Sequence, residues 1–386
     1  MIGSCDAVVV GAGPAGAASA LGLARAGFRV VVADARSVPG ATPCGEGIMP
    51  AGVQALAALG LSPEIERGRR AFHGITFVTH AGRPARGLFP AWASGLAVPR
   101  GDLHRALWDA LDRHPRVELL RGHHLEEIRQ TNGRVTGVDL RERVTRRRVV
   151  VDAALTVGAD GLRSRFHALP GVTVTRPARA RYGFTAQLDG VSGLGDTVEV
   201  HLVPQGEVYV TPQGGQRASI ALLVEGDRVR PPFAPRLAFW QALAAAPALA
   251  SRLAVAQLST TPRVKGPLGS TVRGASGPGY LLVGDAAGGL DPVTGEGVAL
   301  GLVTGVALGV QAARLGPGDA AALAALAERR RLERPVRLIT STLLALLAMP
   351  PCADAAIALA GLLPPVFSAL LGVAAGHAPA SAAAPA

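Results

Sequence analysis

Three glycines and one aspartate near the N-terminus have the spacing of a nucleotide-binding turn. Gly11, Gly13 and Gly16 form a Gly-x-Gly-x-x-Gly pattern, and Asp34 follows after roughly 20 further residues. The first glycine permits a tight turn, the second lets the backbone approach a pyrophosphate, and the third lets a helix pack closely on a sheet. An acid at this distance can accept a hydrogen bond from a ribose hydroxyl. These residues predict a nucleotide site.

The elements around this pattern are a strand, a helix and a second strand. Residues 7–10 are an apolar run that predicts a buried strand, and residues 17–26 predict a helix that ends at Gly27. Residues 29–33 predict a second buried strand. A glycine pattern is weak evidence alone, but it is strong evidence between a strand and a helix. The helix N-terminus then offers N–H groups and partial positive charge to phosphates.

Two later motifs also follow predicted strands. Residues 149–157 lead into Gly158-Ala159-Asp160-Gly161, and residues 280–283 lead into Gly284-Asp285. An aspartate at the carboxyl end of a strand can accept hydrogen bonds from ligand hydroxyls. Further on, the segment from Gly295 to Gly297 begins a long helix of small residues, whose N-terminus favours an anion.

The order and spacing of these motifs resemble the para-hydroxybenzoate-hydroxylase-like flavoproteins over residues 1 to about 345. That superfamily includes aromatic hydroxylases, flavin halogenases and geranylgeranyl reductases. The resemblance implies an α/β fold: a Rossmann-like FAD-binding domain, an inserted antiparallel-sheet substrate domain and a helical C-terminus. It implies FAD as cofactor and NAD(P)H as reductant. The implied cofactor-binding residues are Gly11, Gly13, Ala15, Gly16, Asp34, Arg36, Cys44, Gly45, Arg100, Asp160, Gly284, Asp285, Gly295 and Gly297.

Changes of sequence texture predict the domain boundaries. The FAD-binding domain is expected in three segments, residues 1–71, 100–166 and 265–345. Alternating apolar and polar runs predict the substrate domain over residues 72–99 and 167–264. Residues 346–376 are expected to form C-terminal helices, and residues 377–386 a disordered tail.

Local patterns predict four further details. Asp102 is expected to cap a helix over residues 103–113, and residues 240–253 are expected to form one helix. A separate helix is expected over residues 320–334. The Gly/Pro-rich loop over residues 36–50 is expected to have no regular structure.

Three residues are candidates for the chemistry. Cys44 lies on the loop expected to pass the flavin, where it is a packing residue, a redox thiol or a covalent flavin link. Glu46 is an acid/base or a structural carboxylate. Pro292 precedes the helix that begins at Gly295. The sequence does not decide among these residues.

Two reactions fit the motifs. The first is a monooxygenase that hydroxylates a lipophilic phenol or polyketide with NAD(P)H and O₂. The second is a geranylgeranyl-reductase-like enzyme that saturates a prenyl or lipid double bond. Cys44-Gly45 and residues 291–297 are similar to that branch, but its Tyr-x-Trp-x-Phe-Pro motif is here Tyr209-Val-Thr-Pro212. On the sequence alone, this departure favours the hydroxylase. A halogenase would need a catalytic lysine and a Trp-x-Trp-x-x-Pro stretch, which the sequence lacks.

Composition limits the partners and the compartment. The net charge is +11, but Lys265 is the only lysine and the arginines are scattered, so no nucleic-acid partner is expected. Three cysteines in 386 residues form no disulfide framework. The chain begins with a predicted strand rather than a charged leader, so a cytoplasmic protein is expected. Cysteines, histidines and carboxylates do not cluster at ligand spacing, and no metal is expected.

Three apolar segments, residues 336–349, 352–363 and 366–375, lie near the C-terminus. Each is shorter than the roughly 20 residues that a membrane span needs. They predict helices packed across the domain junction or, alternatively, a surface for peripheral membrane contact. A small lipophilic aromatic or isoprenoid substrate is expected in either case.

Overall fold

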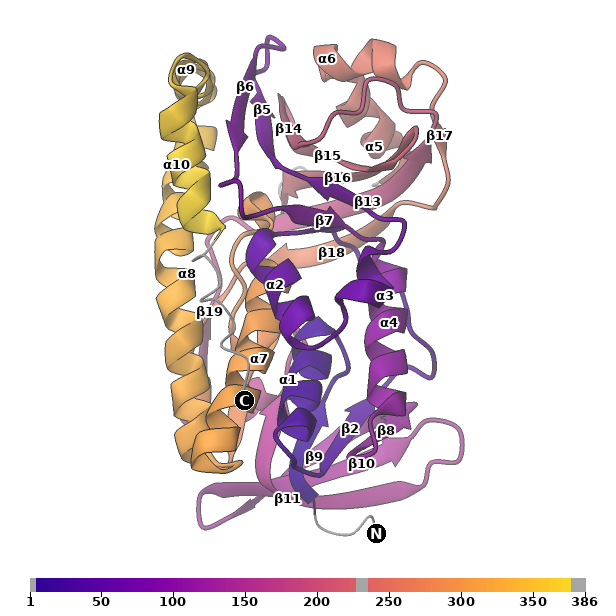
Figure 1. Cartoon of the computed structure of the whole chain (residues 1–386), viewed down its shortest axis with the longest axis vertical. Coiled ribbons are helices and arrows are strands. Elements are labelled where there is room, and N and C mark those ends of the chain that lie inside the picture. The colour runs from indigo at the N-terminus through magenta and orange to yellow at the C-terminus, as the bar shows by residue number, and fades with distance from the viewer. Residues whose placement is uncertain (1–4, 227–234, 376–386) are drawn as a thin grey trace.

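The computed structural model describes residues 5–226 and 235–375. Two β-sheets lie at opposite ends of the molecule, with helices between and beside them (Figure 1). The fold class is the predicted one: α/β, with an inserted, mostly antiparallel sheet and a helical C-terminus. The tail predicted over residues 377–386 lies outside the described residues.

The first sheet is built around β1, because both neighbours of this strand pair with it in parallel. β1 (Cys5–Val10) lies between β2 (Val30–Asp34) and β11 (Arg148–Gly158). Farther out, β2 pairs with β8 (Val117–Arg121), and β11 pairs with β21 (Tyr280–Leu282), again in parallel. Parallel strands bring their carboxyl ends to one edge of a sheet. That edge therefore collects the glycine turn, the acid after β2 and the motifs after β11 and β21.

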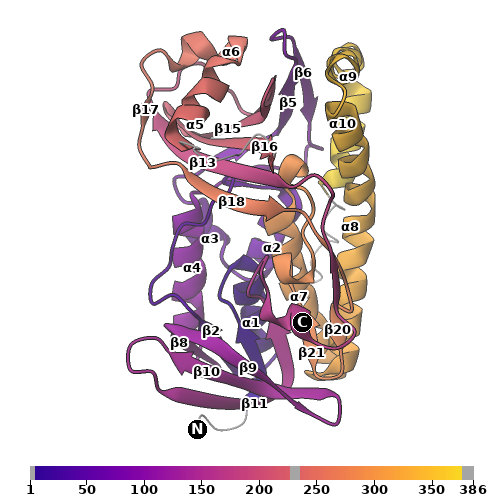
Figure 2. The ribbon, with the colours of Figure 1, turned by 180° about the vertical axis from the view of Figure 1, so that it is seen from behind.

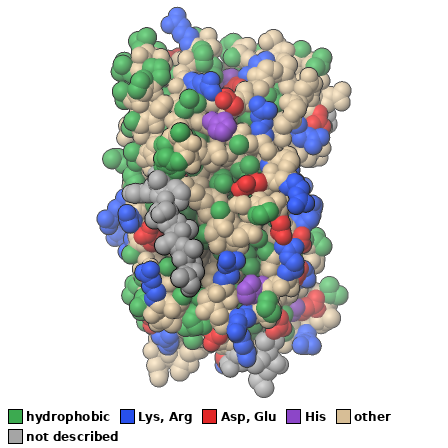
Figure 3. All heavy atoms as spheres, in the orientation of Figure 1, with side chains coloured by type: hydrophobic (Ala, Val, Ile, Leu, Met, Phe, Trp, Pro, Cys, Tyr) green, Lys and Arg blue, Asp and Glu red, His purple; other side chains and the backbone are tan. Residues whose placement is uncertain are grey.

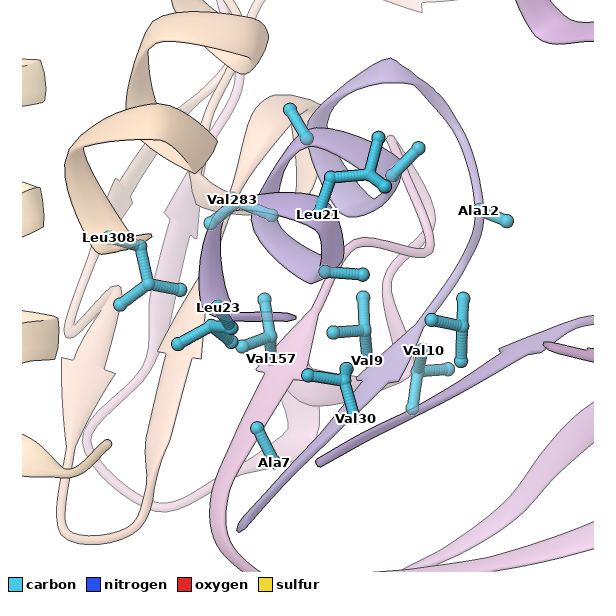
Figure 4. Packing of buried hydrophobic residues seen from close by; sticks show 14 of the residues in the cluster. Ala7, Val9, Val10, Ala12, Leu21, Leu23, Val30, Val157, Val283 and Leu308 are labelled. Atoms are coloured by element: carbon cyan, nitrogen blue, oxygen red, sulfur yellow. The ribbon is translucent and has the colours of Figure 1, made fainter. Parts of the chain in front are cut away.

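The valine-rich strands of this sheet are covered on both faces, as parallel strands usually are. Figure 4 shows Val9, Val30 and Val157 from three neighbouring strands packing beneath Leu21 and Leu23 of helix α1 (Pro14–Arg25). All five side chains are almost completely buried. This packing fixes the helix over the sheet and so fixes the direction of the helix N-terminus.

An antiparallel extension completes the first sheet. β9 (His123–Thr131) pairs with β10 (Arg134–Glu142), which pairs in turn with β11. The arginine-rich residues 141–148 lie in the hairpin between β10 and β11. Two-residue β20 (Ser276–Gly277) forms the far edge beside β21.

The second sheet has the strand order β17-β13-β16-β15-β14-β5-β6, with β18 also paired to β13. Its pairs are antiparallel except that β14 runs parallel to β5. Helices α5 (Pro235–Ala244) and α6 (Pro247–Ala250) cover one face, where Phe239 and Leu249 are fully buried. The strands are β5 (Gly74–Val78), β6 (Pro84–Leu88), β13 (Arg181–Asp189), β14 (Val198–Val203), β15 (Gly206–Gly214), β16 (Arg217–Glu225), β17 (Gln257–Leu258) and β18 (Arg263–Leu268).

A small sheet joins the two predicted domains. β3 (Gly47–Ile48) and β4 (Arg70–Phe72) both pair with β7 (Gly95–Ala97). The expectation of no regular structure over residues 36–50 is therefore wrong at β3. Its pairing partner lies far along the chain, and the composition of the loop gives no sign of it. A second small pair, β12 (Thr173–Thr175) with β19 (Thr271–Arg273), lies apart from these sheets.

Helices α2 (Pro50–Ala58), α3 (Ser62–Glu66), α4 (Arg100–Arg113) and α7 (Gly297–Leu315) lie between the two sheets (Figures 1 and 2). α1 and α7 cross in backbone contact. A Cβ at Gly305 would lie 2.5 Å from the Ser19 nitrogen, and one at Gly309 would lie 2.5 Å from the backbone of Gly22. The small residues of α7 are therefore required where the two helices cross.

Three helices form one side of the molecule. α8 (Asp319–Leu347) runs along both regions, and α9 (Pro350–Leu362) and α10 (Pro364–Ala374) lie beside β6 (Figures 1 and 2). α9 and α10 begin at prolines, which suit the first helical position because it needs no N–H donor. The three apolar segments predicted near the C-terminus are therefore helical, and new helices begin at Pro350 and Pro364.

The predicted end of a helix at residue 334 is wrong. α8 is 29 residues long in total, and it passes through Pro335 and ends at Leu347. A proline inside a helix removes one backbone hydrogen bond. Leu332 and Val336, on either side of it, pack with Leu290 and Leu300, and this apolar contact holds both halves in one helix.

Two further local predictions are wrong. Residues 240–253 are not one helix: α5 ends at Ala244, Ala246 is extended, and α6 restarts at Pro247. Pro247 has no N–H to donate into the preceding turn, and its ring disfavours a helical conformation at Ala246, so α5 ends before it. Asp102 does not cap α4, which begins two residues earlier with Pro99 as its N-cap. The Asp102 carboxylate instead accepts a hydrogen bond from Arg69 at 2.6 Å.

Candidate functional site

One cavity of about 1150 Å³ runs from the glycine turn to the C-terminal helices. Its lining at one end comes from the carboxyl ends of β1, β2, β11 and β21, with the loops that follow them. Its lining at the other end comes from the second sheet and from α8, α9 and α10. The first end carries most of the charged and polar groups. The second is mostly apolar, and its polar side chains are Thr185, Tyr209, Thr211, Lys265 and Thr342.

The three glycines of the first motif have different surroundings. Gly11 has φ +103°, and a Cβ there would lie 2.4 Å from the Ala159 carbonyl oxygen. A Cβ at Gly16 would lie 1.8 Å from the carbonyl oxygen of Gly11. Gly13 is different, because a Cβ there would meet no atom within 4 Å and the residue lines the cavity. Gly11 and Gly16 therefore serve packing, whereas Gly13 keeps space open for a ligand.

Asp34 is buried and already fully hydrogen-bonded. Its Oδ2 accepts from the Ala12 N–H and from the Arg36 guanidinium, both at 2.8 Å. Its Oδ1 accepts from the N–H and Nε of Arg36 at 2.8 and 2.9 Å. Burial raises the pKa of Asp34, but the hydrogen bonds and charge of Arg36 outweigh this and lower the pKa below its usual value. A carboxylate offers about four acceptor sites, so Arg36 is better placed than Asp34 to meet a nucleotide directly.

Helix α4 supplies two residues that the sequence analysis missed. The Trp108 ring is fully buried, and its Nε1–H donates to the Ala12 carbonyl at 2.9 Å. Together with Asp34, it therefore holds Ala12 from both sides. The His104 Nδ1 lies 2.7 Å from the Gly40 carbonyl oxygen, and the ring lines the cavity. Burial, followed by the charges of Arg100 and Arg36, lowers the pKa of His104 to about 4, so the imidazole is neutral.

Three buried polar atoms on the cavity wall have no hydrogen-bond partner within the described chain. They are Asp160 Oδ1, Arg100 Nε and His104 Nε2. Asp160 Oδ2 accepts from the Arg165 N–H at 2.8 Å, and burial raises the pKa of this carboxyl. Buried polar atoms in proteins almost always have a partner, so a polar ligand in this end of the cavity would complete the set. With the open space at Gly13, the residues present fit a dinucleotide such as FAD.

The second anchor brings in the only lysine of the chain. Asp285 lines the cavity after β21 and accepts from Lys265 Nζ of β18 at 3.0 Å. Gly284, Gly295 and Gly297 also line the cavity, and α7 begins at Gly297. The first N–H groups of α7 have no partner within the helix, so they offer a positive end at the cavity wall.

Among the three candidate catalytic residues, Cys44 and Pro292 line the cavity, and so does Gly45. Glu46 does not line it. Its Oε1 accepts from the Arg100 N–H at 3.0 Å, and its Oε2 accepts from the Gln187 amide at 2.8 Å. This pair of contacts joins the start of α4 to β13 and favours the structural alternative for Glu46.

The loop before α7 is tied to the second sheet by a buried set of charges. Arg181 of β13 donates to Asp291 at 2.7 Å and also to Glu207 of β15. The Tyr209 hydroxyl donates to the Val293 carbonyl at 3.1 Å. In the sequence, Arg181 and Glu207 are charged residues in the region of the predicted antiparallel sheet, and a charged residue that such a sheet buries needs a partner. The sequence does not indicate which residues those partners are.

The fold and the cavity define a class: a two-sheet flavoprotein with a dinucleotide turn at the centre of its parallel sheet. A family model described as an FAD binding domain matches residues 4–341. The chain belongs to this FAD-binding family and is an FAD-dependent oxidoreductase.

Curated relatives include both reductases and a hydroxylase. A menaquinone reductase of Mycolicibacterium smegmatis is 31% identical over 319 residues, covering 78% of this chain and 74% of the relative. A digeranylgeranylglycerophospholipid reductase of Methanopyrus kandleri is 30% identical over 316 residues, covering 78% of each. A 3-demethoxyubiquinol 3-hydroxylase of Escherichia coli is 29% identical over 310 residues, covering 77% of this chain and 76% of the relative.

The solved structures share the fold at lower identity. A geranylgeranyl bacteriochlorophyll reductase-like protein of Thermoplasma acidophilum has a TM-score of 0.76 at 19% identity. The match covers 97% of this chain and 96% of that protein.

Replacing Gly13 by valine should weaken FAD binding at least about tenfold, a change of about 1.4 kcal/mol. A Cβ at this position would meet no protein atom within 4 Å, so the valine side chain would take up space beside the turn that faces the cavity. Flavin fluorescence titration of the apoprotein measures the change. Gly195→Val is the control, because Gly195 also has open space around its Cβ but lies away from the cavity. Equal FAD affinity in both variants would remove Gly13 from the site.

Glu46 variants should separate its structural and acid/base alternatives. Glu46→Gln keeps an acceptor for the Arg100 N–H, so near-normal FAD binding and turnover are expected. Glu46→Ala leaves two partly buried donors, the Arg100 N–H and the Gln187 amide, without this acceptor, and it should lower the free energy of unfolding by about 1 kcal/mol. Steady-state kinetics and urea unfolding are the measurements. A Glu46→Gln protein that folds and holds FAD but has lost turnover would instead support proton transfer by this carboxyl.

Proposed function

We propose that this protein reduces a carbon–carbon double bond in a prenyl-type chain, using FAD and an NAD(P)H-type reductant. The observation that carries the proposal is the apolar half of the cavity. Its walls come from the second sheet on one side and the C-terminal helices on the other. They include Phe72, Ile75, Phe77, Val198, Val200, Leu223, Leu343, Leu346, Leu347, Ile357, Phe367 and Leu371.

This lining suits a long flexible hydrocarbon better than a small ring. Polar partners are few in this half, so binding energy must come from burial of apolar surface, about 25 cal/mol per Å². A long chain offers far more such surface than a phenol. The relatives named as menaquinone and digeranylgeranylglycerophospholipid reductases support the same substrate class.

When bound and reduced, FAD supplies a hydride in this proposal. A proton must reach the neighbouring carbon, so that one C=C bond becomes a CH–CH bond. Cys44 is our assigned proton source, because it lines the cavity and its Sγ accepts a hydrogen bond from the Glu46 N–H at 3.4 Å. That contact uses a sulfur lone pair and leaves the thiol hydrogen uncommitted. The apolar walls keep water away from the reduced cofactor.

Hydroxylation of a lipophilic ring by O₂ is the second candidate. Tyr209-Val-Thr-Pro212 lacks the Trp and Phe of the reductase motif, and this departure favours the hydroxylase. The hydroxylase relative supports it as well. We place it second because the apolar lining extends over the second sheet and three C-terminal helices, which offers more apolar surface than a single ring would cover.

The reductase proposal is tested without oxygen. Purified enzyme, NAD(P)H and a geranylgeranyl lipid should give a product heavier by two hydrogens per double bond, detected by mass spectrometry. Ala356→Trp should raise KM for that lipid at least about tenfold, because Ala356 lines the apolar half of the cavity. Ala358→Trp is the control, since Ala358 is exposed on the same helix and lies outside the lining.

Two outcomes would contradict the proposal. The first is oxygen incorporation into a lipophilic phenol in air, with no anaerobic saturation of the prenyl lipid. The second is an equal KM for the lipid in the Ala356→Trp and Ala358→Trp variants.

We also propose that α9 and α10 contact a lipid surface. Leu359, Leu362 and Val366 of these helices are apolar, and more than half of each side chain is exposed. Figure 3 shows hydrophobic side chains at the upper left, where Figure 1 places α9 and α10. Within the described chain, α7 alone is long and apolar enough to span a bilayer, and it packs against α1 and α8. α9 and α10 meet the same test only as a pair bent by 104°.

Flotation with liposomes tests the lipid contact. The wild-type protein should co-float with vesicles, and a Leu362→Glu, Val366→Glu double variant should lose most of this binding because charge opposes insertion. A variant with glutamate at Val144, which is exposed at the opposite end, is the control. Equal flotation of all three proteins would exclude the α9–α10 surface.

A further inference from the structure

Glu296 is a buried carboxyl that neither the fold nor the proposed reaction uses. It is the N-cap residue of α7 and is only 2% exposed. Its side chain makes no capping hydrogen bond, and its Oε1 has no partner among the described residues. Burial raises the pKa of this carboxyl to about 8. At neutral pH, Glu296 is therefore mostly the uncharged acid.

The surroundings of Glu296 explain why it stays neutral. It lines a second cavity of about 420 Å³ between α2, α7, α8 and α10. The other lining residues are Ala51, Pro90, Ala299, Leu300, Val303, Arg331, Leu332, Pro335, Val336, Ala369, Gly372 and Val373. None of the lining residues from α2, α7 or α10 is titratable.

Only α8 brings charge near this cavity. Arg331 lines it, but its side chain is 65% exposed and lies 3.8 Å from Glu328. Two other α8 residues, Arg329 and Arg337, both pair with Glu333. Arg329, Arg331 and Arg337 thus pair within α8, and Asp319 pairs with Arg134 of β10. Among the described residues, no α8 side chain forms an ion pair with Glu296.

The position of Glu296 connects it to the FAD cavity. Gly295 and Gly297, its two neighbours, both line that cavity, whereas Glu296 lines the second one. An α-helix N-terminus carries roughly half a positive charge, which favours an anion nearby. An ionised Glu296 at this N-terminus would cancel that charge. Negative charge on Glu296 and negative charge in the FAD cavity therefore oppose each other.

We propose that Glu296 is a proton acceptor coupled to flavin reduction, so that the reduction potential of the bound FAD depends on pH partly through this residue. Reduction to the anionic form consumes two electrons, from NAD(P)H or a chemical donor, and one proton. Where Glu296 starts ionised, it takes one further proton from solvent. The carboxylate becomes a carboxylic acid, and no other bond changes.

The test is the midpoint potential of the FAD-loaded protein as a function of pH. If reduction takes up one proton per two electrons, the midpoint potential falls by about 30 mV per pH unit. This is because a tenfold change in the equilibrium constant of a two-electron couple corresponds to about 30 mV. The wild type should follow this slope at low pH and about twice this slope just above pH 8. Glu296→Gln should keep the single slope throughout. Glu66→Gln, on an exposed carboxyl, should behave as the wild type.

A second measurement covers the case in which the glutamine variant does not hold FAD. Redox-induced infrared difference spectra of the wild type above pH 8 should show a protonated carboxyl band appearing on reduction. Equal slopes in wild type and Glu296→Gln, or no such band, would overturn the proposal. Either outcome would leave the reductase assignment intact, because that assignment depends on the substrate assay alone.

Stability gives a readout that needs no cofactor. The pKa of Glu296 is raised in the folded chain, so the unfolded chain releases its proton first as pH rises. The contribution of Glu296 to stability is therefore complete at low pH and is lost between about pH 4.3 and about pH 8. Glu296→Gln should raise the Tm of the apoprotein relative to the wild type at pH 8 more than at pH 4. An equal difference at both pH values would contradict a neutral buried acid.

Discussion

The close backbone contact between α1 and α7 sets the geometry on which the site depends. Gly22 of α1 meets Gly305 and Gly309 of α7, where no Cβ would fit. Nearer the cavity, a Cβ at Gly301 would lie 3.0 Å from that of Ala15. The two helices thus hold a fixed distance, and both point their N-termini at the same cavity. The N-terminus of α1 follows the glycine turn that begins at Gly11, and the N-terminus of α7 follows the loop that carries Pro292.

A second constraint joins the two sheets across the cavity. Lys265 of the second sheet pairs with Asp285 after β21, and Arg181 pairs with Asp291 before α7. Both pairs link a strand of the second sheet to a loop on the cavity wall between β21 and α7. Breaking a buried pair leaves an uncompensated charge and costs several kcal/mol, so the Arg181 pair in particular resists separation of the regions.

Local patterns predicted the nucleotide turn and the strands around it. Each depends on residues adjacent in the sequence, where glycine spacing and apolar periodicity carry the information. The family resemblance implied the fuller set of cofactor residues, and every residue of that set except Gly16 lines the cavity. Trp108, Lys265 and Arg181 were missed, because their partners lie far along the chain. The errors at Asp102 and Pro335 have the same origin, because both depend on residues that are distant in the sequence. Asp102 binds Arg69, and packing on both sides of Pro335 outweighs the lost backbone hydrogen bond. Pro247 is different, since its own sequence signal was sufficient and was overlooked.

The reaction class depends on which group can give up a proton beside the substrate. The Tyr209 hydroxyl already donates its hydrogen bond to the Val293 carbonyl. Burial also raises the pKa of Tyr209 well above its usual value, so this hydroxyl is a poor proton source. Both carboxylate oxygens of Glu46 are occupied outside the cavity. Glu296 lines the other cavity. Cys44 alone among these four lines the FAD cavity with its hydrogen uncommitted, which is what the addition of hydride and proton to an alkene requires.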